Sequence, residues 1–196
     1  MTNRPRRSAA FTLLEVIMVI MIMAVLSALV IPNSDPSFYE LLQATARIVM
    51  TDLAYGRSLA VGNNDKYQFT WDAPNNRYIL QYSGTNSAMR TMPSSPFRST
   101  TDPPSQHIVD LDELPHVGPP VVLMGVIAKA GSTSTVITTT EYGPLGGTTS
   151  SSTPTIWLKA GSGTGARYIT VQINPVTGST VIGNVTNVGP PSSLLH

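Results

Sequence analysis

The chain contains no cysteine, so disulfide bonds and thiolate-ligated metal sites are excluded. Charged residues are also scarce, at 12% of the 196 residues. Serine, threonine, glycine and proline are abundant in their place. This composition favours a β-rich extracytoplasmic domain with long loops over a cytosolic enzyme.

Basic residues form no cluster outside the N-terminus. The first ten residues hold three arginines, and the rest of the chain carries nine basic and eleven acidic side chains, a net charge of −2. Residues 63–196 carry seven of each sign. Nucleic-acid binding is therefore not expected, because it depends on a concentrated positive charge.

Patterns typical of catalysis or metal binding are also missing. The three histidines, His107, His116 and His196, are scattered and are predicted to be exposed or in loops. The acidic run at 110–113 lacks the glycine and the ligand series of a calcium loop, and the glycines at 161–165 are followed by neither a lysine nor a helix pattern. We therefore expect no catalytic residue, no cofactor and no metal site, and a protein that is not an enzyme.

A long apolar segment lies near the N-terminus. Arg4, Arg6 and Arg7 precede a nearly uninterrupted hydrophobic run from Phe11 to Ile31. About 20 apolar residues are enough to cross a bilayer as a helix. The arginines before the run, and the lack of basic residues just after it, predict a cytoplasmic N-terminus. The sequence thus predicts a single-pass inner-membrane protein with the rest of the chain in the periplasm or outside the cell.

Glu15 lies inside this apolar run. A charge at the centre of a membrane helix costs about 2.5–3.5 kcal/mol on insertion scales, so such a residue usually has a partner and a function. A secretory signal peptide or an ordinary signal anchor would explain the basic start and the apolar stretch. Neither explains Glu15, and the run is longer than the apolar part of most signal peptides.

The sequence Phe-Thr-Leu-Leu-Glu-Val at 11–16, behind a short basic leader and a small residue, resembles the type IV prepilin (class III) signal. The resemblance implies that prepilin peptidase cuts between Ala10 and Phe11 and methylates the new amine of Phe11. The family usually has glycine before the cut, where this chain has the similarly small Ala10. Glu15 would then set the assembly register by pairing with the amine of a neighbouring subunit.

A second helical pattern follows Pro32, which stops or kinks the first helix. Its apolar face is predicted to consist of Leu42, Ala46, Val49, Leu53 and Ala60. The polar residues Arg47, Asp52 and Arg57 are expected to lie off that face. The helix is predicted to end at Gly62-Asn63-Asn64.

The rest of the chain is predicted to be β-structure. Residues 66–71 and 77–82 form a predicted hairpin, and residues 134–141 are predicted to form one strand. Further strands are expected at 107–111, 121–128, 155–159, 167–173 and 179–182. Residues 83–106 are predicted to form a long loop, and residues 189–196 a frayed tail.

Two segments extend the resemblance beyond the N-terminus. Residues 52–61 and the Tyr-Gly-Pro-Leu-Gly element at 142–146 resemble the helix end and an aromatic-x-Pro-x-Gly element of GspH/FimT-type minor pseudopilins. The implied fold is α+β and pilin-like: a long N-terminal transmembrane helix packed on an antiparallel β-sheet head. Its parts are a cleaved leader (1–10), a transmembrane helix (11–31), a continuation of that helix (32–62) and the head (63–196).

The function implied by this resemblance is that of a minor pseudopilin, a structural subunit of the type II secretion pseudopilus. Its implied partners are prepilin peptidase, other pseudopilins or pilins that contact its N-terminal helix, and the inner membrane. A minor pilin of a type IV pilus, serving initiation, adhesion or DNA uptake, is the alternative. A membrane-anchored hydrolase would require a catalytic constellation, and the sequence shows none.

Overall fold

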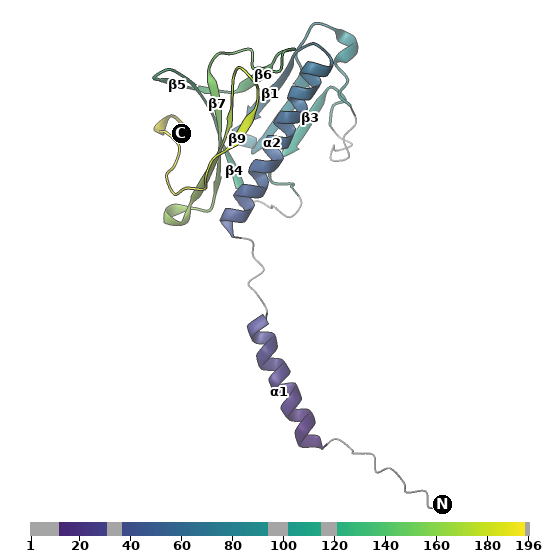
Figure 1. The fold of residues 1–196 in the computed structure, drawn as a ribbon, viewed down its shortest axis with the longest axis vertical. Helices are drawn as coiled ribbons and strands as arrows, with labels where there is room; N and C mark the ends of the chain where they lie inside the picture. The colour runs from purple at the N-terminus through teal and green to yellow at the C-terminus, as the bar shows by residue number, and fades with distance from the viewer. Residues whose placement is uncertain (1–11, 31–36, 94–101, 115–120, 195–196) are drawn as a thin grey trace, which may run out of the picture. The chain divides into compact units, whose positions relative to one another are not determined.

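The computed structural model describes residues 12–30, 37–93, 102–114 and 121–194. The chain divides into two units, Met1–Asp35 and Pro36–His196. The first unit contains the helix α1 (Leu13–Val30), and the second contains the helix α2 (Phe38–Gly62) followed by the β-strands (Figure 1). The two helices fall within the ranges 11–31 and 32–62 that the sequence predicts to be helical. The predicted continuity of the two helices falls on residues 31–36, which lie outside the described residues.

Helix α2 has well-defined signals at both ends. At its start, the Ser37 hydroxyl accepts a hydrogen bond from the Glu40 amide (3.4 Å). The Glu40 carboxylate accepts one from the Ser37 amide (3.3 Å), which completes a capping box. At its end, Asn63 caps the helix and Asn64 has a positive φ of 49°. The predicted end of this helix is therefore confirmed.

The strands form two antiparallel sheets, one with the order β3-β2-β1-β6 and one with the order β5-β4-β7-β8-β9. The first sheet consists of β1 (Tyr67–Asp72), β2 (Arg77–Tyr82), β3 (Gln106–Asp110) and β6 (Thr139–Tyr142). The second consists of β4 (Val121–Ala130), β5 (Thr133–Ile137), β7 (Thr153–Ala160), β8 (Arg167–Ile173) and β9 (Thr180–Ile182). The predicted hairpin at 66–82 is present as β1 and β2, which pair from Tyr67–Tyr82 to Asp72–Arg77.

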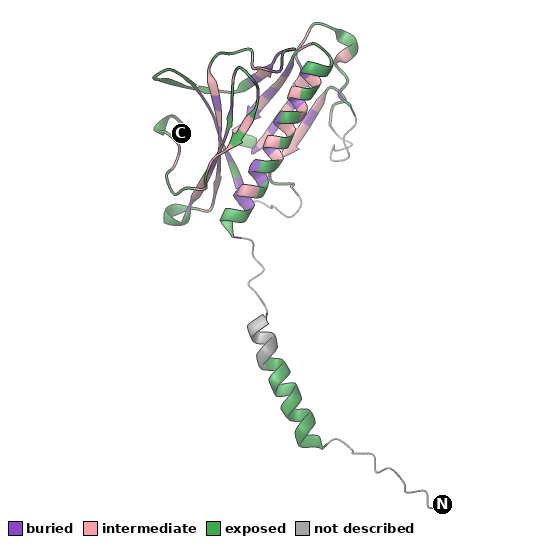
Figure 2. Cartoon of the chain, viewed as in Figure 1, coloured by how far each residue is buried: buried purple, intermediate pink, exposed green. Residues whose placement is uncertain are grey.

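Helix α2 packs against strands of both sheets. The predicted apolar face is confirmed, since Leu42, Ala46, Val49, Leu53 and Ala60 are each at most 1% exposed. Below the helix lies an aromatic layer in which Phe69 stacks on Trp71, with ring centroids 5.7 Å apart. Figure 2 shows the buried residues on α2 and on the strands of this unit. The second unit is therefore an α+β fold with one core between a helix and antiparallel sheets, as the sequence predicts.

The prediction of a single strand at 134–141 is wrong, because the structure divides this segment at Thr138. Its first part, β5, pairs with β4 in the second sheet, whereas its second part, β6, pairs with β1 in the first. The Thr138 carbonyl between them accepts a hydrogen bond from the Trp71 amide (2.7 Å). The β-branched residues at 135–140 run through this bend without interruption, so the local pattern does not reveal which sheet each half joins.

The predicted long loop and frayed tail both contact the core. In the loop, Met92 is 3% exposed, and its amide donates to the Pro104 carbonyl (2.8 Å). In the tail, Leu194 is 9% exposed and lies over Gly125, where an added Cβ would come within 2.8 Å of the Leu194 Cδ2 atom. Leu194 therefore anchors the tail on β4, contrary to the prediction.

Candidate functional site

The N-terminal candidate site is built around Glu15 in the first turn of α1. The Glu15 amide lies 3.1 Å from the Thr12 carbonyl and 3.3 Å from the Thr12 hydroxyl, both of which accept from it. A threonine that accepts in this way is a typical start of a helix. The Glu15 side chain is exposed and forms no ion pair within the described residues. The predicted processing residues, Ala10 and Phe11, lie outside the described residues.

Helix α1 is apolar on all sides, apart from Glu15 near its start and a serine near its end. Every side chain from Leu13 to Ala24 is exposed, including Leu13 at 80% and Met21 at 67%. A helix that is hydrophobic all round is normally covered by protein or by lipid. Within the described residues, no helix has both the length and the apolar character required to cross a membrane.

A buried polar cluster under α2 was not anticipated from the sequence. The Tyr78 hydroxyl on β2 donates to the Asp52 carboxylate on α2, and His107 on β3 interacts electrostatically with Asp52. Burial raises the pKa of Asp52, while the hydrogen bond from Tyr78 and the charge of His107 partly oppose that rise. Burial is also the main reason that the pKa of Tyr78 lies well above its usual value.

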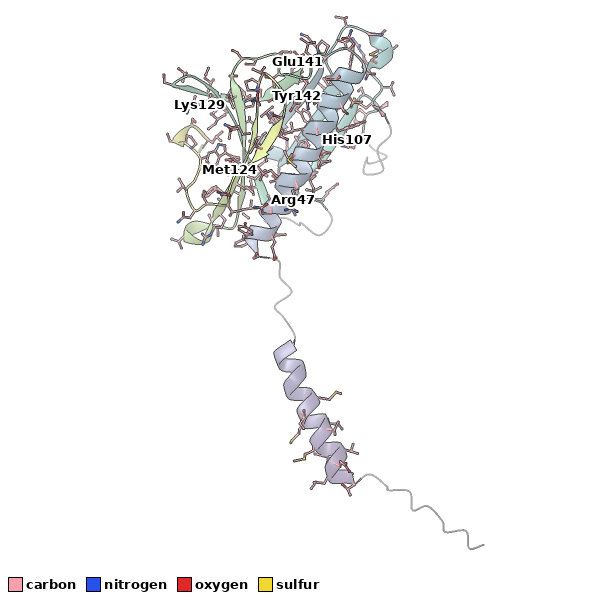
Figure 3. All side chains as sticks on the ribbon, viewed as in Figure 1. Arg47, His107, Met124, Lys129, Glu141 and Tyr142 are labelled. Carbon is pink, nitrogen blue, oxygen red and sulfur yellow. The ribbon has the colours of Figure 1, made fainter. Side chains whose placement is uncertain are left out.

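Two sequence predictions about this cluster need correction. His107 was expected to be exposed or in a loop, but it is 7% exposed on β3, where it pairs with the buried Leu80. Figure 3 shows His107 beside α2. Asp52 was expected to lie off the packed face, but it is only partly exposed and contacts the sheet. Helical spacing predicts the direction of a side chain around the helix axis to within about a quarter turn. That precision does not distinguish the centre of a packed face from its border. The predictions for His116 and His196 fall outside the described residues.

The raised pKa of Asp52 predicts a pH dependence of stability. A carboxyl whose folded pKa is raised stabilises the fold below its unfolded pKa, and this contribution is lost as pH rises through the folded pKa. Wild type should therefore lose stability relative to Asp52→Asn as pH rises from about 4, by about 1.4 kcal/mol for each unit by which the pKa is raised. Denaturant unfolding of the full chain in detergent, repeated across pH, measures this difference.

Asp72 supplies a control with the opposite sign. Hydrogen bonds from Asn75 and from Arg77 (2.8 Å) lower the pKa of Asp72. Wild type should therefore gain stability relative to Asp72→Asn as pH rises from the acid range. The stability of wild type relative to each asparagine variant should thus change with pH in opposite directions. A change in the same direction for both would contradict the assignment of Asp52 as a carboxyl that is costly to ionise.

A second polar cluster lies at the C-terminal end of α2. Arg57 was also expected to lie off the packed face, yet it is partly buried, and its Nε donates to the Gly146 carbonyl (3.2 Å). Gly146 belongs to the predicted aromatic-x-Pro-x-Gly element, which forms a tight loop after β6. The Tyr142 hydroxyl is buried and has no hydrogen-bond partner within the described residues. Burial raises the pKa of Tyr142, and the positive charge of Arg57 opposes this rise.

The other candidate segments lie in turns. Asp110 accepts a hydrogen bond from the Asp112 amide (2.9 Å), and Asp112 accepts one from the Asn76 side chain (2.7 Å), so both carboxylates stabilise a turn. The glycines at 161–165 form the predicted turn, which leads into the strand β8. The part of the chain described by the structure contains no group of three or more acidic or histidine side chains that could hold a metal ion.

Comparisons with known proteins identify the N-terminal segment. Residues 5–31 match the family described as the prokaryotic N-terminal methylation motif, a range that includes Ala10, Phe11 and Glu15. The chain is thus an α+β protein that carries a prokaryotic N-terminal methylation motif. No curated protein matches it in sequence.

Two crystal structures of the type IV minor pilin FimU from Pseudomonas aeruginosa are similar to the chain. One has 15% identity and a TM-score of 0.44, over 78% of this chain and 94% of that one. The other has 16% identity and a TM-score of 0.42, over 78% of this chain and 99% of that one.

Proposed function

We propose that this chain is a subunit of a type IV pilin-like filament and, more specifically, a minor pseudopilin of a type II secretion system. The observation that carries the proposal is the methylation motif over residues 5–31, which contains a carboxylate in the first turn of an apolar helix. The proposed mechanism is polymerisation, in which the chain acts as a structural component and not as an enzyme.

The proposal gives a role to the residues on each side of the predicted cut. Prepilin peptidase would cleave between Ala10 and Phe11, remove the three arginines of the leader, and leave a methylated amine on Phe11. Glu15 would lie four residues further along, about one helical turn. In the assembled filament, its carboxylate would neutralise the amine of a neighbouring subunit, because an unpaired charge is costly in an apolar environment.

The two units would then have separate tasks. The span predicted for Phe11–Ile31 would anchor the chain in the inner membrane with its N-terminus in the cytoplasm, and neighbouring helices would cover its apolar sides during assembly. Unit Pro36–His196 has its own buried core and would present its surface to other subunits or to secreted cargo. The resemblance of residues 52–61 and 142–146 to GspH/FimT-type chains supports a minor subunit.

Processing is the first prediction of this proposal. Chain recovered from membranes of cells with an active prepilin peptidase should begin at N-methylated Phe11, as measured by intact-mass and N-terminal peptide mass spectrometry. Cells without the peptidase provide the control and should yield only the chain that begins at Met1. A chain that stays uncut in peptidase-positive cells, or a cut after Ser27 or Ala28, would contradict the proposal.

A deletion strain separates the two kinds of filament. For a pseudopilin, loss of the chain should reduce export of type II secretion substrates and leave pilus-dependent motility intact. Reduced pilus number with normal secretion would instead show that the chain is a minor pilin. Complementation with the wild-type chain should restore the affected process in either case.

A further inference from the structure

Three segments that are distant in sequence meet at the C-terminal end of α2. Arg57 on the helix donates to Gly146 in the loop after β6 (3.2 Å). The Thr148 amide, just beyond that loop, donates to the Pro175 carbonyl in the β8–β9 turn (2.8 Å). A Cβ added at Gly178, in the same turn, would come within 3.1 Å of the Arg57 Cδ atom. Arg57 therefore lies where the helix, the loop and the turn come together. Figure 3 shows Tyr142, at the start of the loop, near this end of α2.

Each of the three segments exposes a large apolar side chain. Leu145 is 95% exposed, Val176 is 82% exposed, and Val61 is 49% exposed. We name this region, consisting of Arg57, Val61, Leu145 and Val176, the Arg57 surface. Scattered exposed apolar residues are common, so exposure alone decides little. What sets these residues apart is that the segments that carry them meet at one partly buried cation, Arg57.

The turns that carry Leu145 and Val176 are held by hydrogen bonds. The Gly143 amide donates to the Gly147 carbonyl, and the Gly146 amide donates to the Gly143 carbonyl (both 2.9 Å). In the β8–β9 turn, the Val176 amide donates to the Asn174 side chain (3.0 Å). Binding through such turns requires little additional ordering of the backbone, which lowers the entropic cost of association.

Arg57 retains unused binding capacity. Its Nε is bonded to Gly146, but neither of the ion pairs formed within the described residues includes its guanidinium. Glu141, the residue before Tyr142, is paired with Lys66 (3.4 Å) and with the Ser83 hydroxyl (2.8 Å). A guanidinium presents several donors in a planar fork, and a carboxylate is the protein group that best matches that geometry.

We propose that the Arg57 surface is a docking site for a different protein that presents an apolar side chain next to a carboxylate. The apolar side chain would be covered by Leu145, Val176 and Val61, and the carboxylate would pair with Arg57. Charge complementarity favours a different protein over a second copy, because a symmetric contact between two copies would bring two guanidinium groups together.

Photo-cross-linking in cells that make the full chain tests this inference. With p-benzoylphenylalanine in place of Leu145, irradiation should give one defined product with another protein. The same replacement of Val188, which is 70% exposed in the segment after β9, is the matched control and should not give that product. Arg57→Gln should lower the yield from position 145 at least about tenfold, as expected for a central arginine of an interface.

Val176→Asp is a second variant for the case that Arg57→Gln misfolds. Val176 is exposed, so its replacement should not disturb the core. It should lower the yield through repulsion of the partner carboxylate, whereas Val181→Asp, at a residue 63% exposed on β9, should not. Peptide mapping should locate the cross-link within a few residues of an aspartate or glutamate. A product of two copies of this chain, an equal yield at Val188, or a yield unaffected by both Arg57→Gln and Val176→Asp would overturn the inference.

The result is separable from the proposed function. The N-terminus of the same irradiated protein can be determined by mass spectrometry. An uncut chain that still forms the product would overturn the filament proposal and leave the docking site supported. A chain that is processed at Phe11 but forms no product at position 145 would support the filament proposal and overturn the docking site.

Discussion

Replacing Glu15 with glutamine is expected to leave cleavage before Phe11 intact and to lower incorporation into filaments at least about tenfold, the equivalent of 1.4 kcal/mol. Glutamine keeps the size and polarity of the side chain but removes the charge that would pair with the neighbouring amine. That amine would then stay uncompensated in an apolar environment, which is costly. Quantitative immunoblots of sheared filaments, normalised to the processed chain in membranes, measure the effect.

Glu40→Gln is the matched control, since it makes the same chemical change on the other helix. Glu40 is exposed and accepts a hydrogen bond from the Ser37 amide, a role that the glutamine oxygen can also fill. This variant should be processed and incorporated like wild type. Normal incorporation of Glu15→Gln, or an equal loss in both variants, would show that Glu15 does not set the register.

Replacing Gly56 with valine is expected to destabilise the head by about 3 kcal/mol or more, because α2 and the sheet leave no room there for a side chain. A Cβ added at Gly56 would lie 2.5 Å from the Phe69 Cε2 atom and 3.2 Å from the Leu80 Cδ1 atom. Phe69 is fully buried and packed against Trp71 and Tyr142, so its ring has little room to move. Thermal unfolding should show a midpoint lower by about 6–12 °C.

Gly62→Val separates this clash from the general effect of valine in a helix. Gly62 also lies in α2, but an added Cβ there would meet nothing within 4 Å. Helix propensities of glycine and valine differ by only a few tenths of a kcal/mol, so the Gly62 variant should unfold near the wild-type temperature. Similar losses at both positions would contradict the view that contact with Phe69 restricts position 56 to glycine.

The polar residues on α2 show how far helical periodicity can be used. The five apolar positions that the spacing predicts are all buried, although the buried Leu41 was not among them, and Arg47 is exposed as expected. Asp52 and Arg57, in contrast, lie at the borders of the packed face and bond to Tyr78 and Gly146. The partners of these two residues are set by strand pairing far along the chain, so the helix sequence alone cannot reveal them.

The sequence by itself determined the features that depend on local interactions. The positions of both helices, the end of α2 at Gly62-Asn63-Asn64 and the first hairpin follow from apolar periodicity and turn residues, which act over a few residues. The methylation motif is likewise contained in one short segment. The proposed role of Glu15 follows from this segment alone, because a lone carboxylate in an apolar run requires a partner whatever the rest of the fold is.

Only the tertiary structure decided which distant segments meet. The division of residues 134–141 between two sheets, the burial of His107 and the convergence of three segments on Arg57 all depend on long-range pairing. Such contacts are selected by the packing of the whole core, and many alternative pairings satisfy the same local pattern. The filament function is therefore proposed from a local motif, whereas the docking site became visible only in the folded head.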